Sequence, residues 1–560
     1  MSNRSLTLLM GFVAFLILAV GVVFVVFLAS SGGGDDSSAS DDKTDTKTDD
    51  KKKKASASGI CGGNILYVPG GDPTSVLDPI QVGDVTTAEY VAEIFGGLVT
   101  LDLDLEIQPD IAEKWDVSAD GKVYTFRLRD DVVFHNGRRV TAEDFKYSFE
   151  RAADPANASL QVLPYLGGVV GVKDKYTGKA KEVSGVKVVD ERTLQITLLE
   201  PEAYFLAELT YPVSYVVDQE QIKTNARNWT QKPNGTGPFR VAEFKAAEKI
   251  RLVRNDRYHL GPAKLDEIVF ELGGGSISTR FQNDEIHVAG VPLLQLDDVK
   301  AGNNPLSQFY RPQPEMSLSY VAFNVKQAPF DDPKVRQAFA MAIDYRNINQ
   351  NLYFNALRVA TGILPPEMPG HNPAATGYKF DPTQAKRLLS ESKYAANMPQ
   401  ITLKFAGSAG GGSDLLQALQ SDWQDVLGVT VDLQAIDPSA YLRERKKKTF
   451  QMLADGWIAD YPDPENFIGK LFGGSSDLNV LNYANPEVDA LLDQARNEQD
   501  SEKRLRLYQQ AEQKIIDDAV IIPEFWGVAH YLVKPCIQNW PEVSLPVPKY
   551  RYIEIDSTKK

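Results

Sequence analysis

The sequence contains little cysteine and little histidine. Its 560 residues include two cysteines and five histidines. No Cys-x-x-Cys, His-Glu-x-x-His or Gly-x-Ser-x-Gly pattern occurs in it, which excludes the common motifs of zinc binding, dithiol redox chemistry, zinc proteases and serine hydrolases. His135 has no second histidine or cysteine nearby in the sequence, so we expect it to have a structural role. We therefore expect no metal, no cofactor and no enzymatic activity.

Basic residues are outnumbered by acidic residues. Lysine and arginine number 60 against 75 aspartates and glutamates, which gives a net charge of −15. Nucleic acids and anionic membrane surfaces bind proteins through basic patches, so neither is an expected partner. Hydrophobic residues make up 43% of the chain, which is ample for a core, and the length predicts two or three domains.

The two cysteines, Cys61 and Cys536, leave two interpretations open. In an extracytoplasmic protein they could form a disulfide that ties together the two ends of the folded region. They could equally be two unrelated reduced thiols, because a sequence does not show whether two distant side chains meet.

The N-terminus combines a long apolar run with a low-complexity segment. Residues 6–29 carry no charge and are long enough to cross a bilayer as a helix, which takes about 20 residues. Arg4 precedes this run, which predicts a cytoplasmic N-terminus. We expect residues 1–29 to be a transmembrane anchor, with a cleaved signal peptide as the alternative. Residues 30–60 contain no aromatic residue, and we expect them to be a disordered linker.

Beyond Gly62, local patterns predict both strands and helices. Residues 123–129 alternate between polar and apolar side chains like a half-buried strand, and residues 119–121 form a hairpin turn before it. Thr141 is placed to cap a helix. Residues 234–239, Asn-Gly-Thr-Gly-Pro-Phe, predict a fixed and unusual backbone path, because they combine two glycines with a proline.

The second half of the chain alternates between predicted strands and predicted helices. Three helices are expected to begin at an Asp-Pro or Asn-Pro pair: Asp332-Pro333, Asp381-Pro382 and Asn485-Pro486. Between them lie predicted strands at residues 401–405 and 429–435. This alternation predicts an α/β domain with a largely parallel sheet.

One stretch, Phe450 to Phe467, has the composition of a binding loop. Its first half alternates like a strand, and its second half contains two prolines, each beside an acid. An extended segment would thus deliver Trp457, Asp460 and Tyr461 into a loop. A carboxylate between two aromatic rings can hold a cation such as an α-ammonium group. The alternative from local pattern alone is a core strand with a capping aspartate.

Four segments carry a resemblance to a known family. They are GWIADYPDPENF at the stretch just described, the gapped block from Ile111 to Phe149, the NGTGPF segment, and the run FNVKQAPFDDPKVRQAFAMAID. Together they resemble the extracytoplasmic solute-binding proteins of ABC importers, in the family that takes up dipeptides and oligopeptides. The resemblance spans most of the chain from Gly62 onward.

The resemblance implies an α/β, two-lobed periplasmic-binding-protein fold with an extra inserted small domain and with hinges between the lobes. Carried onto this chain, lobe I takes residues 61–103, 235–316 and 521–560. The inserted domain takes residues 104–234, and lobe II takes residues 317–520. Cys61 and Cys536 then fall in the same lobe, which favours a disulfide between them.

The resemblance also implies the site residues. Asp460 would hold the amino end of a peptide, and the backbone of Gly456, Trp457 and Ile458 would pair with the peptide backbone. Tyr461 would lie beside the ligand. In lobe I, Gly83 and Val85 would supply the opposite edge.

The implied function is to capture peptides between the lobes and to deliver them to the permease of an ABC importer. The protein would be a monomer held at the outer face of the membrane by residues 1–29, or released into the periplasm if that segment is cleaved. Binding of an oligosaccharide or a metal chelate by the same fold remains an alternative, because Trp457 and Tyr461 could stack on a sugar ring. An extracellular hydrolase and a sensory receptor are two further alternatives.

Overall fold

The computed structural model describes residues 59–73, 76–407, 413–541, 545 and 549–559. The predicted anchor at residues 1–29 and nearly all of the predicted linker at residues 30–60 lie outside these ranges. Within the described ranges, no helix is both long and apolar enough to cross a membrane.

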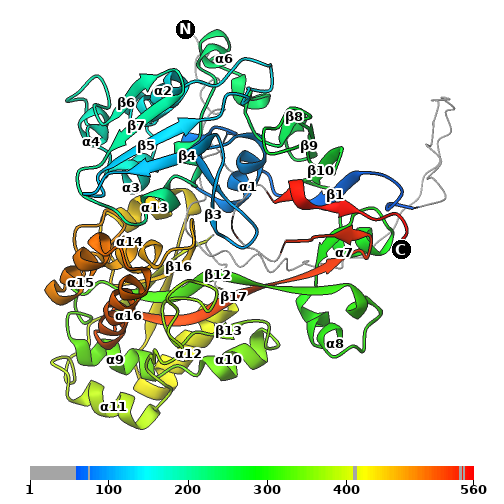
Figure 1. Cartoon of the computed structure of the whole chain (residues 1–560). Coiled ribbons are helices and arrows are strands. Elements are labelled where there is room, and N and C mark those ends of the chain that lie inside the picture. The colour runs from blue at the N-terminus through cyan, green and yellow to red at the C-terminus, as the bar shows by residue number, and fades with distance from the viewer. Residues whose placement is uncertain (1–58, 74–75, 408–412, 542–544, 546–548, 560) are drawn as a thin grey trace, which may run out of the picture.

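The described residues form two lobes of mixed α and β structure, one above the other in Figure 1. This confirms the predicted fold class. The upper part contains two four-stranded sheets, and the lower part contains a seven-stranded sheet with most of the long helices. The predicted boundaries between the lobes and the inserted domain stay predictions.

One upper sheet, which with α1 (Val85–Ile94) we call lobe I, has the strand order β1-β10-β9-β8. Its strands are β1 (Ile65–Pro69), β8 (Phe239–Lys245), β9 (Lys249–Arg254) and β10 (Glu267–Glu271). The segment at residues 234–239 passes against the last turn of α1. A Cβ atom on Gly235 would meet the carbonyl oxygen of Ile94 at 2.0 Å, and one on Gly237 would meet that of Glu93 at 2.5 Å. The glycines are therefore required by a close backbone approach.

The other upper sheet, with α2 to α5, is here called the small domain. Its strand order is β4-β5-β7-β6. The strands are β4 (Ala112–Val117), β5 (Val123–Leu128), β6 (Val186–Asp190) and β7 (Thr193–Thr197), and the helices are α2 (Ala142–Ala152), α3 (Val162–Leu166), α4 (Val172–Tyr176) and α5 (Phe205–Glu208). Tyr124, Phe126 and Leu128 point into its core, as the alternating pattern of β5 predicts. Thr141 begins α2 in a capping box with Asp144, which confirms the predicted cap.

The lower sheet, with its helices, is here called lobe II. Its strand order is β11-β17-β12-β16-β14-β15, and β13 also pairs with β17. The strands are β11 (Val288–Gly290), β12 (Tyr310–Phe323), β13 (Arg358–Val359), β14 (Ile401–Ala406), β15 (Val431–Ile436), β16 (Met452–Ile458) and β17 (Ile521–Val533). The prediction of a largely parallel sheet is wrong. Only β14 pairs in parallel, with β15 and β16, whereas β12 runs antiparallel to both β16 and β17.

The reason lies in β12 and β17, which are long neighbouring strands of opposite direction. They stay paired along their whole length, from beneath β16 out toward α7 and α8 in Figure 1. Their register shifts between Pro314 and Leu318, where residues 315–317 face Gly527. The parallel pattern is confined to β14 and its two neighbours, β15 and β16, and α12 returns the chain between β14 and β15.

The described helices of lobe II are α9 (Pro333–Met341), α10 (Tyr345–Leu352), α11 (Pro382–Ser390), α12 (Asp414–Leu427), α13 (Pro438–Lys446), α14 (Ile468–Phe472), α15 (Pro486–Asn497) and α16 (Ser501–Asp517). Three of them begin where the proline pairs predict. In α9, α11 and α15 the residue before the proline accepts a hydrogen bond from the first turn, which confirms the three predicted caps. The remaining strands and α-helices of the described residues are β2 (Val99–Leu101), β3 (Ile107–Pro109), α6 (Gln219–Thr224), α7 (Ile277–Gln282), α8 (Leu296–Lys300), β18 (Ile537–Gln538) and β19 (Glu554–Ile555).

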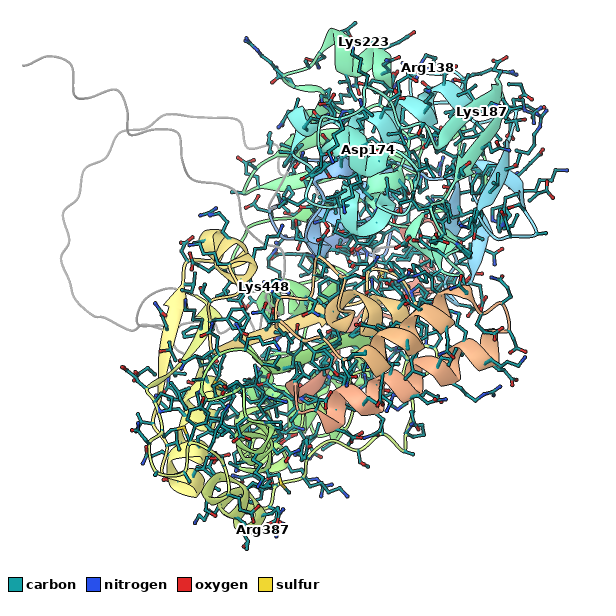
Figure 2. The ribbon with its side chains drawn as sticks, turned by 90° about the vertical axis from the view of Figure 1, so that its left-hand side faces the viewer. Arg138, Asp174, Lys187, Lys223, Arg387 and Lys448 are labelled. Carbon is teal, nitrogen blue, oxygen red and sulfur yellow. A yellow bond between two sulfur atoms is a disulfide. The ribbon has the colours of Figure 1, made fainter. Side chains whose placement is uncertain are left out.

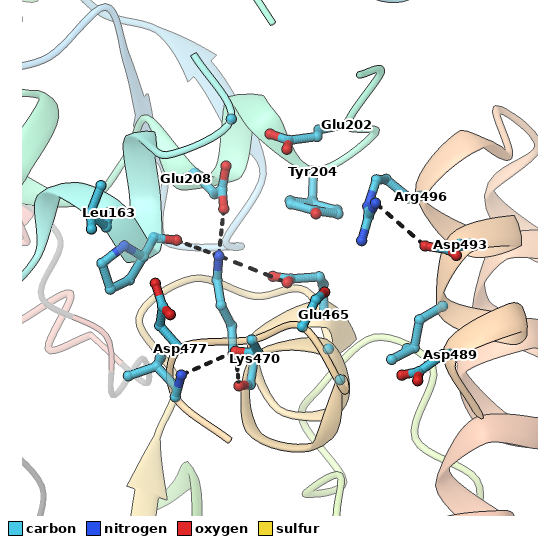
Figure 3. A pocket seen from close by; sticks show the side chains of 18 of the residues that line it. Leu163, Glu202, Tyr204, Glu208, Glu465, Lys470, Asp477, Asp489, Asp493 and Arg496 are labelled. Carbon is cyan, nitrogen blue, oxygen red and sulfur yellow. Dashed lines mark hydrogen bonds and ion pairs between the residues drawn. The ribbon is translucent and has the colours of Figure 1, made fainter. Parts of the chain in front are cut away.

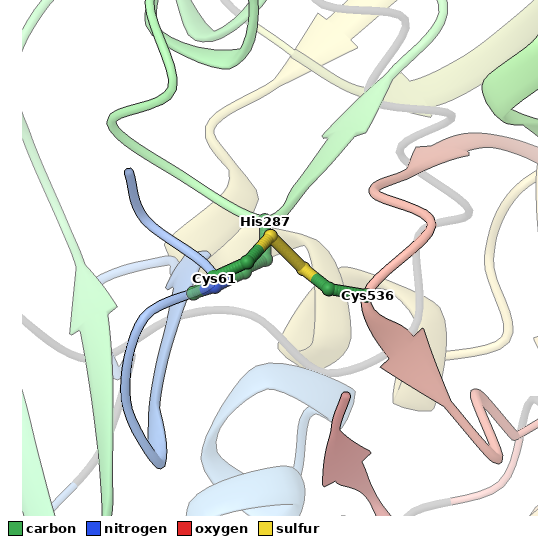
Figure 4. A group of neighbouring side chains, drawn as sticks. All are labelled: Cys61, His287 and Cys536. Carbon is green, nitrogen blue, oxygen red and sulfur yellow. A yellow bond between two sulfur atoms is a disulfide. The ribbon is translucent and has the colours of Figure 1, made fainter. Parts of the chain in front are cut away.

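Cys61 and Cys536 are joined by a disulfide, with their Cα atoms 6.0 Å apart. Both belong to the buried core of lobe I. The bond closes a separation of 475 residues, and Figure 4 shows His287 beside it.

Candidate functional site

The Asp460 side chain lies where lobe II meets the small domain. Asp460 lies two residues beyond the end of β16, and its carboxylate accepts a hydrogen bond from the hydroxyl of Tyr165, which belongs to α3. Asn466 donates to the same oxygen, Oδ2, over 3.4 Å. Among the described residues, no hydrogen bond reaches the other oxygen, Oδ1. The carboxylate is therefore held at the contact between lobe II and the small domain, which we call the seam, and Oδ1 remains available to accept a hydrogen bond.

Burial raises the pKa of Asp460 to about 6. The hydroxyl of Tyr165, the amide of Asn466 and the positive charge of Lys470 act in the opposite direction and do not overcome it. A carboxylate in such a position gains from a cation, because the cation stabilises the charged form that burial disfavours.

A row of tyrosines connects Asp460 to the predicted edge in lobe I. The ring of Tyr165 stacks on that of Tyr211, with centroids 4.1 Å apart and planes 3° from parallel. The hydroxyl of Tyr211 donates to the carbonyl of Val82 over 3.2 Å, and Gly83 follows Val82. Val85 does not continue an extended edge. It is the first residue of α1, after the cap Asp84, and the residue is 43% exposed.

The backbone of β16 offers a partly open edge. Ala459 donates its N–H to the carbonyl of Met316 in β12. Along a strand, the peptide groups of successive residues point alternately toward one neighbouring strand and toward the other. The peptide groups of Gly456 and Ile458 therefore face away from β12, and those of Trp457 face toward it. On the side away from β12, β14 pairs with β16 only at Met452 and Leu453, so no described strand covers Gly456 and Ile458 there. The N–H of Gly456 donates to the carboxylate of Asp455 over 2.9 Å.

The two aromatic rings next to Asp460 are buried. Trp457 is 6% exposed in the core of lobe II, and its indole N–H donates to Asn466 over 2.8 Å. Tyr461 is fully buried and packs into the core of the small domain, while its hydroxyl donates to Glu465. Tyr461 thus fastens lobe II to the small domain, and neither ring forms an open stacking surface.

A cavity of about 420 Å³ lies along the same seam. Figure 3 shows Lys470 of α14 reaching between Glu208 of α5 and Glu465 of its own lobe. Its ammonium group donates to Glu208 over 2.7 Å and to the carbonyl of Pro164 over 2.5 Å, and it lies 3.8 Å from Glu465. Glu202 and Arg496 also line the cavity.

The carboxyl groups of this cavity are shifted by burial. Burial raises the pKa of Glu202 to about 7, and it raises the pKa of Glu208 and of Glu465 as well, with Lys470 opposing the shift in each case. The nearby carboxylates in turn hold the pKa of Lys470 above its usual value. Lys470 is therefore a fixed positive charge within a group of acids.

The described residues contain one group of cysteine, histidine or acidic side chains close enough to hold a metal ion. It is formed by Cys61, His287 and Cys536. Both sulfur atoms are bonded to each other, and Nδ1 of His287 accepts a hydrogen bond from the N–H of Tyr67. No thiolate is left to act as a ligand. The other highlighted histidine, His135, bonds the carbonyl of Gly237 over 3.1 Å, which is the structural role expected of it.

Sequence reasoning missed Tyr165, Lys470 and Glu208 as parts of the seam. Tyr165 lies 295 residues from Asp460, and Glu208 lies 262 residues from Lys470. No local pattern marks either pair, because each contact arises only when the small domain packs on lobe II.

Comparison with known proteins places these features in a family. A model of the bacterial extracellular solute-binding proteins, family 5, matches residues 106–479. The dipeptide-binding protein DppE of Bacillus subtilis is 32% identical, over 83% of this chain and 87% of that protein. The probable deoxycholate-binding periplasmic protein YgiS of Escherichia coli is also 32% identical, over 84% and 89% respectively. The structure of Haemophilus influenzae OppA with the peptide RPPGFSPFR is similar at a TM-score of 0.73 and 25% identity, covering 88% of this chain and 99% of that one.

Proposed function

The chain belongs to the bacterial extracellular solute-binding proteins of family 5, and from this premise we propose that it captures peptides between its lobes, with Asp460 binding the α-ammonium group. The observation that carries the proposal is the Asp460 carboxylate at the seam, with Oδ2 bonded to Tyr165 and Asn466. A ligand ammonium would add a charge-assisted hydrogen bond to this carboxylate.

The backbone would recognise the rest of the peptide. Gly456 and Ile458 present their peptide groups on a side of β16 that no described strand covers. An extended peptide can add to such an edge through main-chain hydrogen bonds, which do not depend on its side chains. Gly83 would contact the ligand from lobe I, near the amino end, because the row of Tyr165 and Tyr211 connects Val82 to Asp460.

The wider role follows from the same premise. The protein would act as a monomer outside the cytoplasm and would pass its ligand to the permease of an ABC importer. Residues 1–29 would hold it at the membrane, or would be removed to release it. Relatives named for dipeptides and for a bound peptide support the peptide as ligand, while another relative is named as a probable deoxycholate-binding protein.

An oligosaccharide is a weaker candidate on the observed geometry. Sugar rings are commonly held against exposed aromatic faces, and the rings of Trp457 and Tyr461 are both buried. The site also places a carboxylate at its centre, which suits a cation better than a neutral ring.

Calorimetric titration with short peptides tests the proposal. Peptides with a free amino end should bind, and their N-acetylated forms should bind at least thirtyfold more weakly, because acetylation removes the charge that pairs with Asp460 at a buried site. Asp460→Asn should weaken free peptides by a similar factor and leave acetylated peptides unchanged. Asp425→Asn, on the exposed surface of α12, is the matched control. Equal affinity for free and acetylated peptides, or full affinity in Asp460→Asn, would overturn the proposal.

A further inference from the structure

Lys470 makes an ionic contact that crosses the seam. It belongs to α14 of lobe II, ten residues beyond Asp460, and its ammonium group bonds Glu208 of the small domain over 2.7 Å. The Lys470 side chain is 11% exposed and that of Glu208 is 4% exposed. Glu465, at 3.8 Å and 9% exposed, completes the group from the side of lobe II. The ion pair is buried from water only while the small domain packs on lobe II.

The same contact is connected to Asp460 through two neighbouring residues of α3. Lys470 bonds the carbonyl of Pro164 over 2.5 Å, and the next residue, Tyr165, donates its hydroxyl to Asp460. The ammonium group also lies 5.7 Å from the centre of the Tyr165 ring. The position of α3 relative to lobe II is thus set by Lys470 on one side and by Asp460 on the other.

We propose that Lys470 is a positioning residue, an interlobe clasp whose ammonium group, seated between Glu208 and Glu465, favours the closed arrangement of the lobes and holds Tyr165 against Asp460. It does not touch the ligand. Its effect on ligand binding rests on the proposed function, because closure is what encloses the peptide.

The energetics of a buried ion pair make the clasp sensitive to the loss of one partner. Two charges taken out of water roughly break even when they are well paired, but a single charge left behind is strongly unfavourable. Opening the lobes returns a stranded charge to water. Removing Lys470 alone leaves Glu208 and Glu465 without their cation and therefore favours the open form. Replacing both Lys470 and Glu208 by apolar side chains removes the contribution of Glu208, while Glu465 keeps the hydrogen bond from Tyr461.

The distance between the small domain and lobe II, here called the interlobe distance, reports directly whether the loss of Lys470 favours the open form. Figure 2 shows Lys187 in the small domain and Arg387 in lobe II at opposite ends of the molecule. Spin labels on Lys187→Cys and Arg387→Cys report the distance between lobes, since both native cysteines are bonded to each other. In Lys470→Met without ligand, the distance distribution should shift to longer values. In Lys470→Met/Glu208→Leu it should shift back toward that of the parent chain.

Arg504→Met is the matched control. Arg504 pairs with Asp463 inside lobe II, with side-chain exposures of 13% and 9%, so its loss should lower the melting temperature without changing the interlobe distance. Lys470→Met should also weaken peptide binding at least tenfold, and the double variant should recover part of that loss. An unchanged interlobe distance in Lys470→Met, with a melting temperature lowered as in Arg504→Met, would overturn the proposal. The distance measurement needs no ligand, so it tests the clasp even if peptides do not bind.

Discussion

At the scale of single residues, the site depends on how Asp460 is surrounded. Its carboxylate sits in a partly buried place with Tyr165 and Asn466 as donors, and burial raises its pKa to about 6. The charged form is therefore fully present only above that pH. This gives the proposed ammonium site a dependence on pH that an exposed aspartate would not have in the neutral range.

We predict that peptide affinity falls on acidification. Above pH 7 Asp460 is ionised and pairs with the ligand, and at pH 5 about nine-tenths of it is protonated when its pKa is about 6. Because the α-ammonium, with a usual pKa of about 8, is mostly charged at pH 7 and fully charged at pH 5, affinity should drop nearly tenfold between pH 7 and pH 5. Titration calorimetry across this range measures the change.

The control for this effect is Asp460→Asn, whose weaker binding should vary much less with pH. Glu202, Glu208 and Glu465 lie near the seam and also have raised pKa values, so the residual slope in that variant measures their share. Affinity that is constant, or that rises as the pH falls, would contradict the assignment of Asp460.

The sequence identifies Asp460 as a site residue but does not indicate which residues contact it. The GWIADYPDPENF run marks the residue through a local motif, and the alternation of β16 predicts which strand delivers it. Tyr165 and Lys470 act through contacts with residues 295 and 262 positions away, so no periodicity or cap could indicate them. The sequence pattern also left open the direction of the Trp457 and Tyr461 rings, which only packing decides.

At the scale of elements, local chemistry was the better guide. The caps before Pro333, Pro382 and Pro486 depend on side chains two or three residues away from their partners, and all three form as predicted. Strand direction in the lower sheet depends instead on where β12 and β17 lie after long detours of the chain. Alternation of strands and helices does not encode that, which explains why the parallel prediction failed.

We predict that Gly235→Ala destabilises the protein through the contact between its segment and α1. The new Cβ would lie 2.0 Å from the carbonyl oxygen of Ile94, and a backbone atom cannot move aside as a side-chain end can. Overpacking of this kind costs about 1–3 kcal/mol. The free energy of unfolding in urea should fall by that amount. Gly63→Ala, where a Cβ meets nothing within 4 Å, is the control and should change it by less than about 0.5 kcal/mol.

At the scale of the whole molecule, two kinds of connection join distant parts of the chain. The strands β12 and β17 run side by side for their full length, and the disulfide joins residues 475 positions apart. The seam contacts of Tyr165, Tyr461 and Lys470 are different, because they join lobe II to the small domain without a covalent tie. Overall architecture was predicted from family resemblance, since no pattern within a single element indicates how the lobes face each other.

We predict that the disulfide stabilises lobe I and does not affect the contacts between lobe II and the small domain. Cys61 and Cys536 belong to the core of lobe I together with Leu66 and Ile268, whereas Asp460 lies against the small domain. Replacing both cysteines by alanine removes a constraint on the unfolded chain, which is worth about 2–4 kcal/mol. The urea midpoint should fall accordingly, and addition of a reductant should lower that of the parent chain but not that of the variant.

Peptide affinity at 25 °C should stay within about twofold in the same variant, because Asp460, Tyr165 and Lys470 keep their contacts. A large loss of affinity in a variant that is still folded would mean that the bond sets the position of the lobes, which places the control of closure at lobe I instead of at Lys470.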